Sequence, residues 1–291
     1  MNNSKRIEVN IINAFVDNEK GGNPAGVVFN ADNLSNKEKQ KVAAKLGLSE
    51  TAFVSMSKTA DFKLDFFTPN RQIAHCGHAT IATFSYLAQS GKIKKANSSK
   101  ETIDGNRDIL LQDDLAFMEQ KPPAYKDVEQ KKVLQSLNLT EDDLMNNAKI
   151  EIVNTGNSFA IIPVASQNIL KNINPDFEFI KQISEEHDLI GYYVFCTQAS
   201  TTDRDANTRM FAPRYGIDEE AGTGMAAGPL ACYLYDKLGQ KKERFLIEQG
   251  WFMKTPSKSL IIVKLTIENE VITKIMAGGK GIPTTIIVVE I

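Results

Sequence analysis

Two short glycine-containing segments have the features of an anion-binding turn. Cys76-Gly77-His78 and Gly222-Thr223-Gly224 each precede an almost wholly apolar stretch that predicts a helix. The first backbone N–H groups of a helix have no partner within it and carry the positive end of its dipole, and glycine lets an anion approach closely. Tight packing could explain one such turn, but the duplication favours binding of a small carboxylate by both.

Side chains at three places near these turns could transfer a proton. His78 opens the first helix, where an imidazole can relay a proton near neutral pH. Glu50 follows a helix predicted from a capping box at Ser35, and its apolar neighbours would partly bury the carboxyl group and raise its pKa. Glu219 and Glu220 precede the second turn, where a carboxylate either stabilises the helix dipole or acts as an acid–base partner of His78.

The cysteine and histidine residues form a poor metal-binding pattern. His75, Cys76 and His78 offer three candidate ligands within four residues, and no second Cys or His cluster completes a tetrahedral set. We therefore expect no metal, and we expect His75 and His187 to be packed or solvated. Cys76 is either a thiolate favoured by the helix N-terminus or a small buried apolar residue.

The elements that must position these residues occur twice along the chain. The segment 153–158 leads into the apolar run 159–164 much as Gly22-Asn23-Pro24 leads into 25–29, and each half then holds one apolar helical segment. A helix without a polar face must be buried on every side, so we expect the neighbouring strands to wrap around it. Pro229 within the second segment predicts a kink or a late helix start. The repeated order indicates an internal duplication with a period of about half the chain.

The composition predicts an ordinary folded protein of two domains, at roughly 100–200 residues per domain. Apolar residues make up 42% and charged residues 24% of the 291 residues, which excludes disorder as the main state. The 34 basic and 36 acidic side chains argue against nucleic acid as a partner. There is no apolar run of the ~18–20 residues that span a bilayer, no signal-peptide core, and no disulfide framework among three cysteines. We therefore expect a cytoplasmic protein with a linker at 120–124.

The combined motifs resemble the PhzF (phenazine biosynthesis-like) family over essentially the whole chain. The resemblance implies an α+β fold of the diaminopimelate epimerase-like type. In that fold two similar domains, related by a pseudo-two-fold axis, each form an antiparallel strand barrel around a central buried helix, with the active site between them. The C-terminal strand returns to the first domain, so the expected domains are 1–119 plus 277–291 and 120–276. The segments that carry the resemblance are Gly21-Gly22-Asn23-Pro24-Ala25-Gly26-Val27-Val28, Leu48-Ser49-Glu50-Thr51, Cys76-Gly77-His78-Ala79-Thr80, Gly222-Thr223-Gly224 and Ala226-Ala227-Gly228-Pro229.

The resemblance also implies a function and a set of site residues. Glu50 would be the acid–base residue of a cofactor-independent isomerase that moves a proton within an amino- or hydroxy-substituted ring acid in a biosynthetic process. His78 and Glu220 would assist. We expect a homodimer that needs no cofactor and binds neither nucleic acid nor a membrane. The residues expected to bind the small carboxylate substrate are Asn23, Cys76, Gly77, Gly222, Thr223 and Gly224.

The chain departs from the family pattern at the second turn, which leaves two other functions open. The family often has Asp-Pro-Ala-Thr-Gly-Ser where this chain has 220–225, so that Met225 replaces a hydroxyl group that could bind substrate. Racemases of the same fold place one cysteine before each glycine turn, whereas here Cys76 is matched by Ala221. The first alternative is an epimerase or racemase that uses Cys76 with Glu50 or Glu220. The second is a non-catalytic small-molecule-binding or protein-interaction module.

Overall fold

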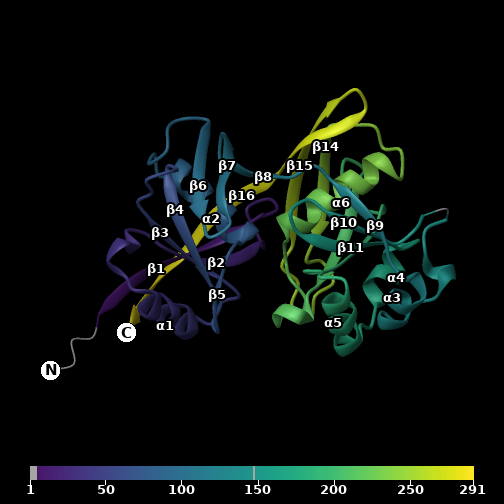
Figure 1. The fold of residues 1–291 in the computed structure, drawn as a ribbon, viewed down its shortest axis with the longest axis horizontal. Helices are drawn as coiled ribbons and strands as arrows, with labels where there is room; N and C mark the ends of the chain where they lie inside the picture. The colour runs from purple at the N-terminus through teal and green to yellow at the C-terminus, as the bar shows by residue number, and fades with distance from the viewer. Residues whose placement is uncertain (1–4, 147) are drawn as a thin grey trace. The chain divides into compact units, whose positions relative to one another are not determined.

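The computed structural model describes residues 5–146 and 148–291, which belong to two compact units (Figure 1). The first unit comprises Met1–Glu119 and Gly278–Ile291, and the second comprises Gln120–Ala277. A single 16-stranded sheet runs through both units, and each unit wraps its part of that sheet around its own apolar helix. The chain therefore has two separate hydrophobic cores, as its length requires.

The sheet of the first unit closes on itself to form a barrel. Its strands follow the order β1-β2-β3-β4-β6-β7-β8-β16, and β16 also pairs with β1. This last pairing is antiparallel and runs from Arg6 opposite Glu290 to Ala14 opposite Gly281. The strands are β1 (Arg6–Ala14), β2 (Asn23–Val28), β3 (Thr51–Ser55), β4 (Phe62–Phe67), β5 (Gln72–Ile73), β6 (Asn97–Thr102), β7 (Gly105–Gln112), β8 (Leu115–Gln120) and β16 (Val271–Glu290).

Helix α2 (Gly77–Gln89) fills this barrel, because apolar or small side chains occur on all of its sides. Its hydroxyl groups do not need water: Thr80 Oγ1 donates to the carbonyl of Cys76 at 2.6 Å, and Thr83 Oγ1 to that of Ala79 at 2.7 Å. The prediction of a buried helix wrapped by strands is thus confirmed. The remaining helices of this unit are η1 (Ala31–Asn33) and α1 (Asn36–Leu46), which begins with the predicted capping box at Ser35.

The second unit repeats this plan around helix α6 (Gly224–Asp236). Its strands follow the order β16-β15-β14-β13-β12-β11-β10-β9. The further strands are β9 (Ala124–Asp127), β10 (Glu151–Asn154), β11 (Ser158–Pro163), β12 (Gly191–Cys196), β13 (Ala206–Phe211), β14 (Arg244–Gln249) and β15 (Ser259–Glu268). The further helices are α3 (Gln130–Ser136), η2 (Glu141–Asp143), α4 (Gln167–Asn172), α5 (Phe177–Glu186) and η3 (Pro213–Tyr215).

The strand pairing makes the internal duplication visible. In the first unit β2–β3 is parallel, β3–β4 antiparallel and β4–β6 parallel, and the pairs β11–β12, β12–β13 and β13–β14 repeat these directions. The barrels are therefore mixed, not wholly antiparallel as predicted. Helices lie between the strands of each parallel pair, and a parallel pair needs such a long crossover connection.

Helix α6 does not start late at its proline, as one of the two sequence interpretations proposed. It begins at Gly224 and includes Pro229, which is buried. Proline removes one backbone donor, so the helix loses one hydrogen bond at this position. Burial of nearly all of the helix compensates for that loss, because packing contributes most of the stability of a helix in a protein.

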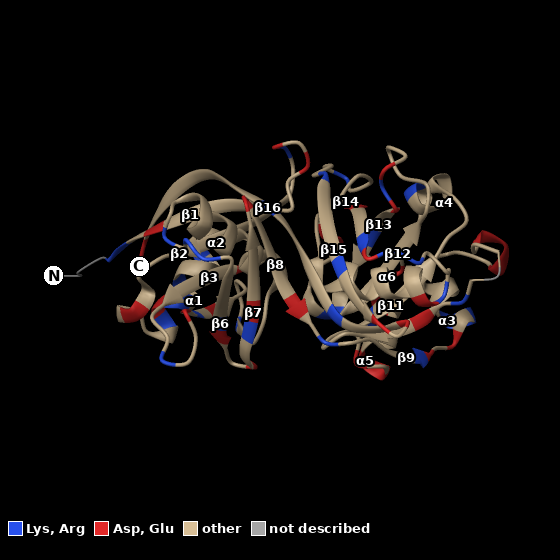
Figure 2. Cartoon of the chain, turned by 90° about the horizontal axis from the view of Figure 1, so that it is seen from above, with Lys and Arg blue, Asp and Glu red and all other residues tan. Residues whose placement is uncertain are grey.

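Charged residues of both signs are distributed over both units. Figure 2 shows Lys and Arg interspersed with Asp and Glu along the ribbons of each unit. In the described part of the chain, no helix is both long enough and apolar enough to cross a membrane.

Candidate active site

The first unit brings Glu50 and His78 together, although they lie far apart in the sequence. Glu50 directly precedes β3, and its carbonyl accepts a hydrogen bond of 3.2 Å from the N–H of Gly26 in β2. His78 is the second residue of α2. The two side chains meet with His78 Nε2 3.3 Å from Glu50 Oε2, and the two residues are only 3% and 7% exposed. A carboxyl group and an imidazole in such contact can hold and exchange a proton.

Cys76 contacts the other nitrogen of the same imidazole. Its Sγ lies 3.6 Å from His78 Nδ1 and within 4.8 Å of a carboxylate oxygen of Glu50. Burial raises the pKa of the Cys76 thiol above its usual range, and the nearby Glu50 adds to this shift while His78 opposes it. The protonated thiol is therefore the favoured form at neutral pH.

Glu50, Cys76 and His78 are also the one group in the described ranges that could offer three ligand atoms to a metal, all within 4.8 Å of one another. His78 Nε2 contacts Glu50 and His78 Nδ1 contacts Cys76. The raised pKa of the Cys76 thiol disfavours the thiolate that a metal would need, so the three residues suit proton exchange better than metal binding. His75 does not belong to the group. Its Nδ1 lies 3.2 Å from Lys100 Nζ, and burial together with Lys100 holds the pKa of His75 well below its usual range.

Asn23 belongs to the same unit as Glu50 and His78 and is held by the turn before β2. It is 4% exposed and lies opposite Ala14 of β1, on the strand next to β3. The preceding Gly22 has a φ of +87°, and a Cβ at this position would lie 2.6 Å from the carbonyl oxygen of Ala14. Only glycine fits there. The turn therefore has a fixed shape that presents Asn23 at the start of its strand.

The second unit joins Thr223 and Glu220 at the start of α6. Thr223 Oγ1 donates a short hydrogen bond to Glu220 Oε2, and Glu220 is 8% exposed. Glu219 has another role, because Arg209 donates to both of its carboxylate oxygens at 2.8 Å. This bidentate pair fastens the segment that leads into the turn. Of the two predicted glutamates, Glu220 is the one at the turn itself.

Gln249, at the end of β14, anchors this turn and was missed in the sequence. Its Oε1 accepts from the N–H of Thr223 at 3.0 Å and from the hydroxyl of Tyr193 at 2.9 Å. Its Nε2 donates to the carbonyl of Glu220 at 2.7 Å and to Thr223 Oγ1 at 3.0 Å. The side chain is fully buried. A glutamine beside Gly250-Trp251 carries no pattern that would have marked it.

Asn157 is a second residue that the sequence analysis did not assign to the site. It follows Gly156 before β11 as Asn23 follows Gly22 at the start of β2. Its Nδ2 lies 3.6 Å from the sulfur of Met225, in the first turn of α6. The repeated Gly-Asn pair was the signal that could have found it.

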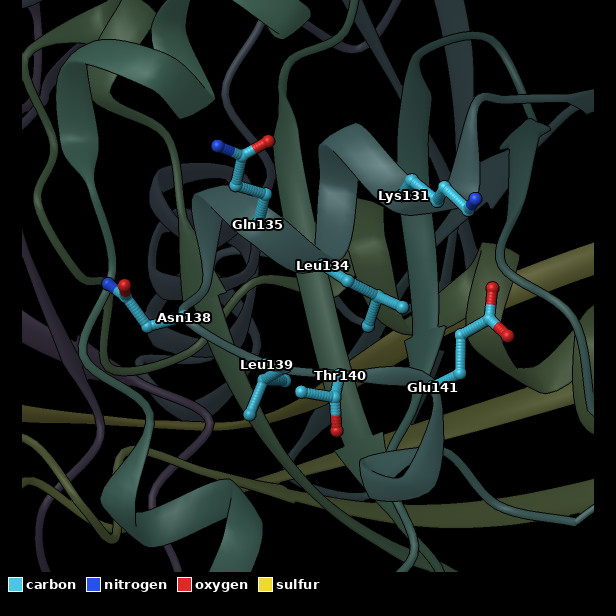
Figure 3. A pocket seen from close by; sticks show the side chains of 7 residues that line it. All are labelled: Lys131, Leu134, Gln135, Asn138, Leu139, Thr140 and Glu141. Atoms are coloured by element: carbon cyan, nitrogen blue, oxygen red, sulfur yellow. The ribbon is translucent and has the colours of Figure 1, made fainter.

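None of the predicted site residues lines either of two hollows on the surface. One, of about 520 Å³, lies in the first unit around Phe62 and the Lys92–Lys95 segment. The other, of about 410 Å³, lies between α3 and the segment before η2 in the second unit (Figure 3). Its apolar floor is Leu134 and Leu139, with Lys131 and Glu141 at its rim. It contains no histidine or cysteine.

Each unit has a barrel-like sheet around an apolar helix, with a glycine turn at the start of that helix. This repeated arrangement defines the diaminopimelate epimerase-like fold. The chain matches the family of phenazine biosynthesis-like proteins, PhzC-PhzF, over residues 12–285. It therefore belongs to the PhzF family, and it is an isomerase of that family.

Three relatives illustrate the match. An uncharacterized isomerase of Clostridium acetobutylicum is 36% identical over 285 residues, which cover 93% of this chain and 94% of the relative. The trans-2,3-dihydro-3-hydroxyanthranilate isomerase of Pseudomonas chlororaphis is 29% identical over 94% of this chain and 95% of its own. The crystal structure of a PhzF-family phenazine biosynthesis protein of Bacillus anthracis superposes with a TM-score of 0.88 at 27% identity, and the match covers 99% of this chain and 100% of that protein.

Proposed function

We propose that this isomerase moves a proton within a small ring carboxylate without a cofactor, with Glu50 as the acid–base residue. The observation that carries the proposal is the buried Glu50 carboxyl group, which lies 3.3 Å from His78 at the start of a buried helix. A carboxyl group shielded from water is suited to taking a proton from carbon and returning it, because bulk solvent does not compete for that proton.

The reaction needs no net oxidation. The Glu50 carboxylate removes a proton from a ring carbon, and the C–H electron pair forms a new double bond to the neighbouring carbon. The electrons of the former double bond then take the proton back from Glu50 at the carbon two positions away. His78 Nε2 orients the carboxyl group during both transfers, and the N–H groups at the start of α2 stabilise negative charge that develops on the substrate.

The difference between the two units supports one acid–base group over a pair of opposed bases. The residue before β12, which corresponds to Glu50 before β3, is Ile190. The residue before the second glycine turn, which corresponds to Cys76, is Ala221. A racemase that works from both faces of a carbon needs a base on each, whereas an isomerase that returns the proton from the same face needs one. The asymmetry therefore favours the isomerase over the cysteine-dependent epimerase.

We assign substrate binding to Asn23 and to the two glycine turns, Cys76-Gly77-His78 and Gly222-Thr223-Gly224. Glu220 assists, held by the hydroxyl of Thr223. We further propose that the protein is a cytoplasmic homodimer that acts in small-molecule biosynthesis.

The test uses trans-2,3-dihydro-3-hydroxyanthranilate, the substrate in the name of the Pseudomonas relative, in deuterated water. We expect the wild type to convert it with the migrating proton largely retained in the product, because Glu50 returns it before the solvent exchanges it, and we expect Glu50→Gln to lower kcat by about 10²–10⁴-fold with an unchanged unfolding curve. Glu8→Gln, an exposed carboxylate of the same unit, is the matched control. Full activity of Glu50→Gln would exclude the mechanism. Inversion of a stereocentre that depends on Cys76 would instead establish the epimerase.

A further inference from the structure

Lys100 is a fully buried lysine in the middle of the first barrel. It lies on β6, and its ammonium group donates to Thr80 Oγ1 at 2.6 Å and lies 3.2 Å from His75 Nδ1. The ring of Phe66 covers it, with Nζ 5.0 Å from the ring centroid. Within the described residues, Lys100 forms no ion pair with a carboxylate. The mechanism above does not use this group.

Such a lysine is unfavourable for the stability of the fold. A buried ammonium group without a carboxylate loses its hydration and gains only neutral partners. Burial lowers the pKa of Lys100 to about 7, with Arg107 adding to the shift and Cys76 and Asp104 opposing it. Lys39, the other buried lysine of this unit, differs because its Nζ pairs with Asp65 Oδ2 at 2.5 Å. A methionine at position 100 would keep the packing and remove the cost.

The two partners of Lys100 flank the first glycine turn. His75 directly precedes Cys76 in the chain. Thr80 lies one helical turn later. Its hydroxyl accepts from Lys100 and donates to the carbonyl of Cys76 at 2.6 Å, so it links the lysine to the backbone of the turn. The ammonium group thus contacts the chain before the turn and, through Thr80, the backbone of the turn itself. No other side chain in the described ranges donates to both of these partners.

We propose that Lys100 is a positioning residue that fixes the Cys76-Gly77-His78 turn, so that His78 remains in contact with Glu50. The proposal rests on the role of Glu50 and His78 given above. Lys100 does not touch the reacting atoms. Its ammonium group holds both sides of the turn. A buried lysine at this position lowers the stability of the fold, as is typical of sites where function and stability compete.

The experiment compares Lys100→Met with Lys39→Met in three measurements. For Lys100→Met we expect an unchanged or higher Tm at pH 7, amide hydrogen exchange at least tenfold faster in residues 77–81, and a kcat at least tenfold lower on trans-2,3-dihydro-3-hydroxyanthranilate. For Lys39→Met we expect a lower Tm, because Asp65 loses its partner, with unchanged exchange in 77–81 and unchanged kcat per folded molecule. Lys100→Gln, which keeps an N–H donor, should recover part of the exchange protection and of kcat.

Two outcomes would overturn the proposal. The first is exchange in 77–81 within twofold of the wild type, because the turn would then be held without Lys100. The second is a fall in Tm as large as that of Lys39→Met with activity lost in proportion to folded protein, because the lysine would then be purely structural. Exchange and Tm need no substrate. A wild type inert towards the test acid would therefore contradict the proposed substrate and leave the role of Lys100 to be decided by those two measurements.

Discussion

Replacing Gln249 by methionine should strongly destabilise the second unit. Methionine has nearly the same length and fills the same space, but it cannot make the four hydrogen bonds of the amide group. Two of the partners have other contacts: Tyr193 OH accepts from Thr208 Oγ1, and Thr223 Oγ1 donates to Glu220. The N–H of Thr223 and the carbonyl of Glu220 lose the partner that Gln249 provides.

The size of the effect follows from these two backbone groups. A buried polar group that loses its partner costs about 1–3 kcal/mol, so two such groups give a loss of about 2–6 kcal/mol in the free energy of unfolding. This is a large change for a substitution that keeps the side-chain volume. The start of α6 would loosen first, because both groups belong to the turn that precedes it.

Trp251, the only tryptophan of the chain, provides the assay. It lies two residues after Gln249, in the second unit, so its fluorescence during urea unfolding reports on that unit. Gln135→Met, on the exposed face of α3, is the matched control and should change the unfolding free energy by less than about 0.5 kcal/mol. A loss below about 1 kcal/mol for Gln249→Met would refute the idea that this amide anchors the turn.

Three further predictions test other parts of the molecule. Cys76→Ala should leave turnover within about tenfold of the wild type, which is a change of at most roughly 1.4 kcal/mol in the activation barrier, because the thiol stays protonated and is not the base. A loss of several orders of magnitude would indicate a thiol base. Gly250→Ala should lower the urea midpoint of the second unit, since Gly250 has a φ of +80° and a Cβ would lie 2.1 Å from the carbonyl oxygen of Ser257; an unchanged midpoint would show that this turn can relax. The free energy of unfolding should rise by up to about 5 kcal/mol between pH 7 and 10.5. The reason is that Lys100 has a pKa of about 7 in the folded protein and 10.5 in the unfolded chain, so the unfolded chain binds more protons in this pH range. Lys100→Met should lack this rise, and equal slopes for both proteins would contradict the assignment.

The sequence alone determined the features that depend on neighbouring residues. Helix α2 lacks a polar face, and this is enough to require burial on every side. The glycine turns before the two helices can be seen in the sequence, as can the capping box of α1, because backbone conformation there depends on residue types a few positions apart. The duplication is visible for the same reason. The mixed direction of the sheet could have been predicted too, from helices long enough for crossover connections.

The tertiary structure decided which distant side chains meet. Glu50 and His78 come from a strand start and a helix start, and their 3.3 Å contact depends on how α2 sits in the barrel. Lys100 belongs to a hydrophilic stretch, 94–101, in which no residue pattern marks it for burial, yet barrel closure turns it inward onto Thr80. Gln249 becomes an anchor because β14 ends beside the second turn. Polar residues of this kind carry no periodic signal, and they become functional only when closure of the sheet removes water around them and leaves a few fixed partners.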